Sequence, residues 1–254
     1  MANSFTTYEI MVTSAAHMLR DNEVVFVGIG IPNVAVNLAR RTRCPGLVLV
    51  YESGAVGARP DRPSPSIGDP ALVAGALGVC SMPEVFQYYL QRGFIDLGFL
   101  GGAQIDRFGN LNTTVIGDYA RPRTRLPGSG GACEIAALAR RILIVMPHKR
   151  RSFVERLDFV TSPGFVSGGD SRAQLRVPGG GPEAVITDLG VLRFPADTHE
   201  MELVSLHPGA TLENVRENTS WPLRVADQLS QTEPPSADEL RVLREEMGGK
   251  PPAS

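Results

Sequence analysis

The sequence predicts an α/β fold with a mostly parallel sheet flanked by helices and a small antiparallel addition near the C-terminal end. Short apolar runs alternate with segments whose apolar residues recur at helical spacing, and this alternation is typical of a parallel sheet with helical crossovers. Glycine-rich turns follow several of the apolar runs. Late in the chain, three short runs are separated only by turn residues, which indicates antiparallel strands.

Residues 1–110 alternate between predicted helices and predicted strands. Helices are expected where one face is apolar at helical spacing, and strands where a short apolar run stands between turn residues. The predicted helices are Thr7–Leu19, Asn33–Arg41 and Pro83–Arg92, and the predicted strands are Val24–Val27, Leu47–Val50 and Phe94–Leu100. Prolines and charged residues dominate Ala58–Asp69, which predicts a surface loop over the rim of the sheet.

The second half of the chain continues the pattern with shorter elements. The predicted helices are Ala132–Arg141 and Thr211–Asn218, and the predicted strands are Asn112–Ile116, Ile142–Met146, Ala184–Thr187, Val191–Phe194 and Glu202–Leu206. The glycine-rich segment Ser162–Gly181 is expected to be irregular. Ser236 and Glu239 have the spacing of a capping box and predict a final helix that ends near Met247. We therefore divide the chain into a main domain, residues 1–231, and a C-terminal linker and capping helix, residues 232–254.

Composition and charge exclude several classes of protein. The chain has 254 residues, 43% of them hydrophobic and 20% charged, and its net charge of −2 gives no electrostatic footprint for nucleic acid or an anionic membrane. No apolar run approaches the roughly 20 residues that span a bilayer. The N-terminus lacks the order of a signal peptide. Cys44, Cys80 and Cys133 lie far apart without metal-ligand spacing. We expect a cytoplasmic protein with reduced thiols, no metal site and no membrane or nucleic-acid partner.

Glu52 is the candidate catalytic residue, because it directly follows the apolar strand Leu47–Val50 and Tyr51. Ligands of open α/β sheets bind at the carboxyl ends of the strands. Ser53 and Gly54 are small, so another molecule can approach the carboxylate closely. These features favour a covalent nucleophile, whereas a helix cap or a rim salt bridge is the structural alternative.

Three glycine-rich turns stand beside strand ends or helix starts, at Gly28–Gly30, Gly101–Gly102 and Gly128–Gly131. Such turns expose backbone N–H groups that can face an anion or an oxyanion. The turn at Gly28 lacks the third glycine of a dinucleotide fingerprint, which disfavours a dinucleotide site. A nucleophile together with oxyanion donors is what acyl transfer requires.

Two basic segments remain open to interpretation. Arg59 and Arg62 are candidates for holding a substrate carboxylate, and solvated loop arginines are the alternative. His148–Arg151 is either a solvated basic face or a phosphate-contact segment.

The chain resembles the β subunit of class I coenzyme A transferases, in particular the glutaconate CoA-transferase type. The order and spacing of many short motifs carry this resemblance over essentially the whole chain. The motifs are Val27–Pro32, Tyr51–Gly54, Ser66–Asp69, Gly101–Asp106, Gly109–Asn110, Ile116–Tyr119, Gly128–Ala132, Lys149–Arg151, Val160–Gly164 and Thr187–Gly190. The chain differs from the glutaconate type at Ala55–Pro63, which leaves the acyl substrate open.

The resemblance implies a fold of the NagB/RpiA/CoA-transferase-like class and a separate α subunit, with heterodimers that pair further into an α2β2 or larger assembly. It implies that Glu52 attacks an acyl-CoA and then carries CoA as a glutamyl thioester. No metal and no permanently bound cofactor are expected, and coenzyme A is both substrate and covalent intermediate. The candidate oxyanion, CoA-binding and acyl-binding residues are Gly28, Gly30, Ser53, Gly54, Gly101, Gly102, Gln104, Gly130 and Gly131.

Two other functions compete with CoA transfer. One is an acyl-CoA hydrolase or lyase on the same scaffold, ring-opening or decarboxylating, in which the carboxylate acts as a base. The other is a non-catalytic regulatory or sugar-phosphate-binding relative, because fold alone does not fix function. A covalent CoA adduct distinguishes transfer from both.

Overall fold

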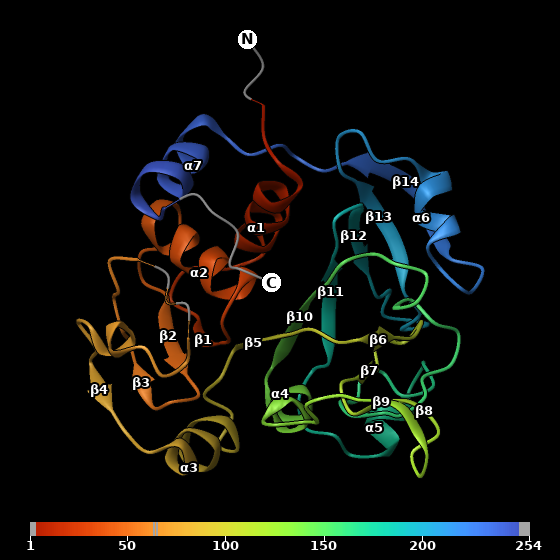
Figure 1. The fold of residues 1–254 in the computed structure, drawn as a ribbon, viewed down its shortest axis with the longest axis horizontal. Helices are drawn as coiled ribbons and strands as arrows, with labels where there is room; N and C mark the ends of the chain where they lie inside the picture. Colours follow the sequence, from red (N-terminus) through yellow and green to blue (C-terminus); the bar gives the residue numbers. More distant parts are fainter. Residues whose placement is uncertain (1–3, 63, 65, 249–254) are drawn as a thin grey trace. The chain divides into compact units, whose positions relative to one another are not determined.

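The computed structural model describes residues 4–62, 64 and 66–248, and the chain divides into two compact units (Figure 1). Unit 1 contains residues up to 99 together with those from 233 onward, and unit 2 contains residues 100–232. Each unit combines a run of strands with short helices. The predicted mostly parallel α/β fold is confirmed.

The sheet of unit 1 is parallel at its centre and antiparallel at one edge. Its strands have the order β5-β1-β2-β3-β4, and β1 pairs in parallel with both β5 and β2. The strands β3 and β4 are short and antiparallel. The bounds are β1 Val24–Val27, β2 Val48–Tyr51, β3 Ala55–Val56, β4 Gly78–Val79 and β5 Leu97–Leu100. The buried apolar residues of β1, β2 and β5 explain why all three were predictable as continuous apolar runs.

Helices α1 (Thr7–His17) and α2 (Ile31–Thr42) pack against each other in unit 1. Helix α3 (Met82–Glu84) continues as a π-helical segment, Val85–Leu90, so the predicted helix Pro83–Arg92 is confirmed with wider turns.

Helix α7 (Ala237–Arg241) also continues as a π-helical segment, Val242–Glu246. The predicted capping box of α7 is present, since the Ser236 hydroxyl accepts from the Glu239 N–H and the Glu239 carboxylate accepts from the Ser236 N–H. The last six residues of the predicted C-terminal segment, 249–254, lie outside the described residues.

The larger sheet of unit 2 has the strand order β10-β11-β12-β13-β14. The pairs β10–β11 and β13–β14 are parallel. The pairs β11–β12 and β12–β13 are antiparallel, which is the pairing that the predicted late meander requires. The bounds are β10 Arg141–Val145, β11 Pro182–Ile186, β12 Gly190–Arg193, β13 Glu202–Leu206 and β14 Arg224–Gln231. The helices are α4 Ala132–Leu138, α5 Ser171–Gln174 and α6 Leu212–Glu217.

Two small hairpins complete unit 2, namely β6 (Gln104–Ile105) with β7 (Leu111–Asn112), and β8 (Val115–Gly117) with β9 (Pro122–Arg125). The prediction of one strand over Asn112–Ile116 was therefore wrong. The Asn112 side-chain oxygen accepts from the Thr114 N–H and the Val115 N–H, which turns the chain between β7 and β8. Strand β14 was not predicted, because its sequence is polar and half exposed. Helix α5 lies in a segment that was predicted to be irregular.

Three further features concern the chain as a whole. The three cysteines are free. Among the described residues, no helix is long and apolar enough to cross a membrane. In the same part of the chain, no group of three or more His, Cys, Asp or Glu side chains is arranged to hold a metal ion.

Candidate active site

Glu52 lies in a tight turn at the carboxyl end of β2. The Gly54 N–H donates to the Tyr51 carbonyl at 2.9 Å and closes the turn, and Glu52 is half-buried while Ser53 is exposed. Gly54 has φ +106°, and a Cβ there would lie 1.8 Å from the Cys80 carbonyl oxygen. Only glycine fits this position, so Gly54 is a geometric requirement of the turn.

The glycine turn after β1 lies at the same edge of the sheet. Val27 and Tyr51 are register partners in the parallel β1–β2 pair, so Gly28 and Glu52 follow neighbouring strand ends. A Cβ at Gly28 or Gly30 would meet nothing within 4 Å, and Gly30 has φ +87° at the start of α2. The backbone of this turn is therefore open to a ligand beside the Glu52 turn.

A chain of buried polar side chains lies directly behind the turn. The Tyr51 hydroxyl donates to Asn33 Oδ1 at 2.8 Å, Asn37 Nδ2 donates to the same oxygen at 2.9 Å, and Arg40 Nη2 donates to Asn37 Oδ1 at 3.2 Å. Tyr51, Asn33 and Asn37 have no exposed surface, and burial raises the pKa of the Tyr51 hydroxyl. Tyr51 therefore stays neutral and anchors the end of β2 to α2.

Sequence reasoning missed this polar chain. The available signal was the i, i+4 pair Asn33 and Asn37 within a predicted helix whose neighbouring residues are apolar. A polar pair in that position on a buried helix face needs hydrogen-bond partners.

The loop after Glu52 is held by arginines of α2. Arg40 Nη1 donates to the Ala58 carbonyl at 2.6 Å, and Arg41 Nη2 donates to the Pro60 and Asp61 carbonyls at 2.9 and 2.7 Å. Arg62 forms an ion pair with Asp69 at 3.5 Å, while the Arg59 side chain is exposed. Of the two predicted substrate arginines, Arg62 already has a carboxylate partner, so Arg59 is the better placed to take a new one.

The other predicted site residues belong to unit 2. Gly101 and Gly102 follow β5, Gln104 opens β6, and Gly130 and Gly131 precede α4. The loop before α4 is held at Gly128, whose N–H donates to the Thr113 carbonyl and whose carbonyl accepts from the Thr113 hydroxyl. The role of these residues beside Glu52 stays a prediction.

Gln104 is buried, and both ends of its amide are engaged. Its Oε1 accepts from Asn112 Nδ2 at 2.7 Å and from the Asp158 N–H at 3.2 Å, and its Nε2 donates to Asp158 Oδ2 at 2.9 Å. Asp158 also accepts from the Gly117 N–H at 3.1 Å. The Gln104 side chain thus links β6 and β7 to Asp158, which also binds the Gly117 N–H of β8.

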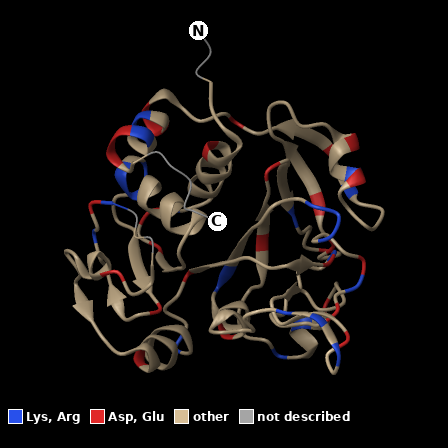
Figure 2. Cartoon of the chain, viewed as in Figure 1, with Lys and Arg blue, Asp and Glu red and all other residues tan. Residues whose placement is uncertain are grey.

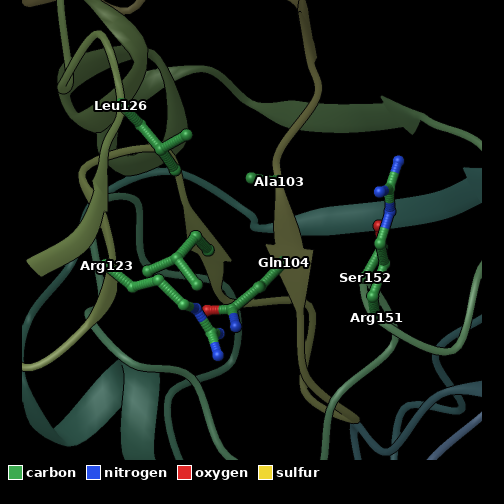
Figure 3. A pocket seen from close by; sticks show the side chains of 7 residues that line it. Ala103, Gln104, Arg123, Leu126, Arg151 and Ser152 are labelled. Carbon is green, nitrogen blue, oxygen red and sulfur yellow. The ribbon is translucent and has the colours of Figure 1, made fainter.

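Strand β9 of unit 2 is basic, since arginines alternate along it with other residues (Figure 2). It borders a cavity of about 400 Å³ that lies beside Gln104 within the same unit (Figure 3). The residues that line this cavity include Gln104, Ile116, Arg123, Leu126, Arg151 and Ser152. In Figure 3, the Arg123 side chain extends toward Gln104. The Gln104 side chain therefore borders a basic cavity, and its role in binding stays a prediction.

The chain matches the family described as coenzyme A transferase over residues 8–218. It is 51% identical to the B subunit of the 3-oxoadipate CoA-transferase of Pseudomonas knackmussii, over 95% of this chain and 93% of that protein. The crystal structure of glutaconate coenzyme A-transferase from Acidaminococcus fermentans matches with a TM-score of 0.90 and 34% identity, covering 96% of this chain and 95% of that one.

A less similar relative has a different activity. The chain is 28% identical to the cholesterol ring-cleaving hydrolase IpdB subunit of Mycobacterium tuberculosis, over 94% of this chain and 93% of that protein. Together, the matches confirm the family that the sequence motifs predicted.

Proposed function

The chain belongs to the coenzyme A transferase family, and on that premise we propose that Glu52 carries CoA from an acyl-CoA donor to a free carboxylate. The chain is a CoA-transferase subunit of the 3-oxoadipate and glutaconate type. Coenzyme A is its substrate, and we propose that no permanently bound cofactor takes part. We also propose the cytoplasm as its location, because three free cysteines suit a reducing compartment.

The proposed reaction is a series of reversible acyl transfers. The Glu52 carboxylate attacks the thioester carbonyl and expels CoA as a thiolate, which leaves an acyl-glutamyl anhydride. The thiolate attacks the glutamyl carbonyl, releases the first carboxylate and forms a glutamyl-CoA thioester. A second carboxylate then attacks that thioester, and the expelled thiolate attacks the new acyl carbonyl, which releases the new acyl-CoA and restores Glu52. Covalent catalysis divides one difficult exchange into easier steps.

One observation carries this proposal. The parallel register of β1 and β2 places Glu52 and the open turn Gly28–Gly30 at neighbouring strand ends, so a carboxylate and unobstructed backbone amides share one edge of the sheet. Each tetrahedral intermediate needs donors for its oxyanion, and one such donor is worth about 2.7–4 kcal/mol. We propose that amides of this turn supply part of that stabilisation, with Gly101, Gly102, Gly130 and Gly131 as the candidates in unit 2.

A short dicarboxylic substrate is supported by two observations. The similar proteins from Pseudomonas and Acidaminococcus are named for 3-oxoadipate and glutaconate, which are both dicarboxylates. In this chain, the exposed Arg59 lies seven residues after Glu52 on a loop that α2 holds in place. A guanidinium binds a carboxylate through two parallel hydrogen bonds, so Arg59 suits the distal carboxylate of such an acid.

A partner subunit is supported by the names of the relatives and by the surface of unit 1. The relatives are named as B subunits, which implies a second kind of chain. Near the Glu52 turn, the Cys80 N–H donates to the Gly54 carbonyl, and the segment before and after Cys80 exposes four large apolar side chains. These are Val73, Leu77, Val79 and Met82. Exposed apolar patches of this kind mark interaction surfaces, so we propose that the α subunit covers this segment.

A hydrolase or lyase is the second candidate, because a ring-cleaving hydrolase subunit is 28% identical to this chain. In that case Glu52 would activate water rather than attack the thioester. These reactions leave different products, since transfer makes a new acyl-CoA, thioester hydrolysis makes free CoA, and ring opening or decarboxylation leaves the thioester intact.

The test uses the chain co-purified with its partner subunit. We expect the complex to exchange CoA between succinyl-CoA and 3-oxoadipate or a related dicarboxylate, without net release of free thiol. The Glu52→Gln variant is expected to lose on the order of 10³-fold or more of this rate, while Glu233→Gln, at an exposed position in the same unit, keeps it. Release of free thiol without exchange by the unchanged complex, lost in Glu52→Gln, would instead support the hydrolase.

A further inference from the structure

The peptide bond before Arg59 is held at both of its polar atoms. Arg40 Nη1, on α2, donates to the Ala58 carbonyl at 2.6 Å. The Arg59 N–H donates to the Ala74 carbonyl at 2.7 Å. A Cβ added at Gly75 would lie 3.4 Å from Arg59 Cβ, so the segment after Ala74 packs closely against this residue. The backbone of Arg59 is therefore fixed in place, while its side chain is exposed.

The Arg59 guanidinium has no partner among the described residues, where no hydrogen bond or ion pair involves its side chain. Arg62 and Asp69 pair with each other at 3.5 Å, so the Asp69 carboxylate is committed. Burial and the charges of Arg41 and Arg59 lower the pKa of Arg40, so positive charge is concentrated where α2 meets this loop. An unpaired guanidinium in such a place favours an anionic ligand.

Buried amides link the same Arg40 to the residue before Glu52. Arg40 Nη2 donates to Asn37 Oδ1 at 3.2 Å, and Asn37 Nδ2 donates to Asn33 Oδ1 at 2.9 Å. The Tyr51 hydroxyl donates to the same Asn33 oxygen at 2.8 Å. Tyr51 and both asparagines have no exposed surface. One buried chain of hydrogen bonds therefore joins the end of β2 to the 58–59 peptide, and a satisfied buried network of this kind is rigid.

The β2–β3 hairpin constrains the same two positions through the backbone. The Gly57 N–H donates to the Leu49 carbonyl at 2.7 Å, so Gly57 lies opposite Leu49 in the antiparallel pair. Leu49 precedes Glu52 by three residues, which corresponds to about 10 Å along a strand. The loop that carries Arg59 thus starts well back from Glu52. A ligand that contacts both side chains has to span a distance that the fold of unit 1 sets.

We propose that the buried chain behind Tyr51 selects the length of the dicarboxylic substrate, because it fixes the distance between Glu52 and Arg59. The inference rests on the proposed function, in which one carboxylate reacts at Glu52 and Arg59 binds the distal one. A guanidinium pairs with a carboxylate through two parallel hydrogen bonds, which require a defined distance. A misplacement of about 1 Å costs on the order of 10²-fold in rate. Arg40 is a positioning residue in this arrangement, because it contacts the backbone of the loop and not the substrate.

The experiment measures kcat/KM for the acceptor acid in the complex of this chain with its partner subunit, with succinyl-CoA as the donor. The acceptors are malonate, glutarate, adipate and pimelate, and hexanoate is the monocarboxylate that matches adipate in length. The variants are Arg40→Gln, Arg59→Gln and Tyr51→Phe, which cuts the buried chain at its other end. Arg43→Gln is the matched control, because Arg43 is exposed at the end of the same helix. Calorimetric binding of the same acids, with Glu52→Gln added to each variant, repeats the comparison without turnover.

The unchanged complex is expected to prefer one diacid to hexanoate and to diacids of other lengths by about tenfold or more. Arg59→Gln is expected to abolish this preference. Arg40→Gln is expected to reduce it by about tenfold, and Tyr51→Phe is expected to reduce it less, because Asn33 keeps its bond to Asn37. In both variants kcat/KM for hexanoate is expected to stay unchanged, and Arg43→Gln is expected to keep the full preference.

An undiminished length preference in Arg40→Gln and Tyr51→Phe would overturn the inference. An equal loss of kcat/KM for every acid would also overturn it, because that is the result of a merely structural role. Absence of any length preference in the unchanged complex would overturn it as well, while exchange that depends on Glu52 would leave the proposed function intact. If exchange does not depend on Glu52, the proposed function fails, and the binding measurements still decide the inference.

Discussion

The turn that follows β2 fixes the position of Glu52. The hydrogen bond from the Gly54 N–H to the Tyr51 carbonyl and the hydrogen bond from the Cys80 N–H to the Gly54 carbonyl hold both sides of the turn. Because φ of Gly54 is +106° and its α-carbon packs against the Cys80 carbonyl, a side chain there would push β4 away. Glu52 is thus placed by backbone geometry rather than by contacts of its own carboxylate.

Gly54→Ala is expected to destabilise the protein by about 1–3 kcal/mol or more and to lower the transfer rate, because alanine is strained at this φ and its Cβ clashes with a backbone oxygen. Urea unfolding and the exchange rate measure the two effects. Gly78→Ala is the control, since Gly78 lies on β4 and an added Cβ would meet nothing within 4 Å. Equal stability of the two variants would show that the turn is not constrained as described.

At the scale of elements, α2 is tied to β2 by the hydrogen bonds among Tyr51, Asn33 and Asn37. Asn33→Leu leaves the buried Tyr51 hydroxyl without its acceptor, which is expected to cost about 1–3 kcal/mol. Tyr51→Phe removes the hydroxyl instead, and Asn33 Oδ1 still accepts from Asn37, so the expected cost is about 0.5–1.5 kcal/mol. Urea unfolding of both variants tests this order. A larger cost for Tyr51→Phe than for Asn33→Leu would contradict it.

The C-terminal helix α7 and its π-helical extension are tied to α1 by a hydrogen bond between His17 and Glu239 and an ion pair between Arg244 and Glu9. His17 Nε2 lies 2.6 Å from Glu239 Oε1, and Arg244 Nε lies 2.6 Å from Glu9 Oε1. Burial raises the pKa of Glu239, but hydrogen bonds from His17 and Ser236 outweigh it and bring the pKa to about 2. The hydrogen bond from Arg244 likewise holds the pKa of Glu9 below its ordinary value.

This lowered pKa makes the packing of α7 sensitive to acid. The ordinary pKa of glutamate is 4.5, so the ionised Glu239 stabilises the fold above that pH, and this contribution is lost as the pH falls from 4.5 toward 2. Glu239→Gln is expected to remove about 2–3 kcal/mol of pH-dependent stability from that window. Urea unfolding at several pH values measures it, with Asp238→Asn, on the exposed face of the same helix, as the control. An unchanged slope in Glu239→Gln would contradict the account.

The elements that the sequence predicted best are those with a strong apolar pattern. Val24–Val27 was predicted with its observed bounds, because all four residues are apolar and the last three are buried. Strand β14 was missed, because polar residues interrupt its pattern and most of it is exposed. The turn between β7 and β8 was also missed, because it depends on side-chain hydrogen bonds of Asn112 that no local propensity reveals.

For the whole molecule, the two units differ in how acid affects them. Unit 2 contains His148, which is buried and stacks on Phe153 with ring centroids 3.8 Å apart, and burial lowers its pKa to about 4. Burial also lowers the pKa of His207. The sequence groups His148 with Lys149–Arg151 as one basic segment, but His148 is part of the core and only the other three residues are exposed.

Unit 2 is therefore expected to lose stability at a higher pH than α7 of unit 1. As the pH falls, a buried histidine with a lowered pKa is protonated in the unfolded chain before it is protonated in the folded chain. The free energy of unfolding therefore decreases as the pH drops from 6.5 toward 4, by up to about 3 kcal/mol for His148. Hydrogen exchange, corrected for its intrinsic pH dependence, is expected to accelerate in unit 2 within that range, and at α7 only below pH 4.5. Simultaneous acceleration in both regions above that pH would contradict this order.

The candidate site was predictable only in part from the sequence. The order of strand, Glu52 and small residues indicated Glu52 as the candidate nucleophile, because strand ends are where α/β proteins place their chemistry. The hydrogen bonds behind Tyr51 were not predicted, because they join residues whose proximity depends on tertiary packing. Tyr51 and Asn33, for example, are eighteen residues apart and share one hydrogen bond.

The central claim is that Glu52 forms a covalent thioester with coenzyme A. The most direct measurement is the intact mass of this chain after the complex with its partner subunit has been incubated with succinyl-CoA and quenched in acid. The account predicts an added mass of one CoA less one water molecule, mapped by peptide analysis to Glu52 and absent in Glu52→Gln. Rapid consumption of the thioester without an adduct, persisting in Glu52→Gln, would contradict the account.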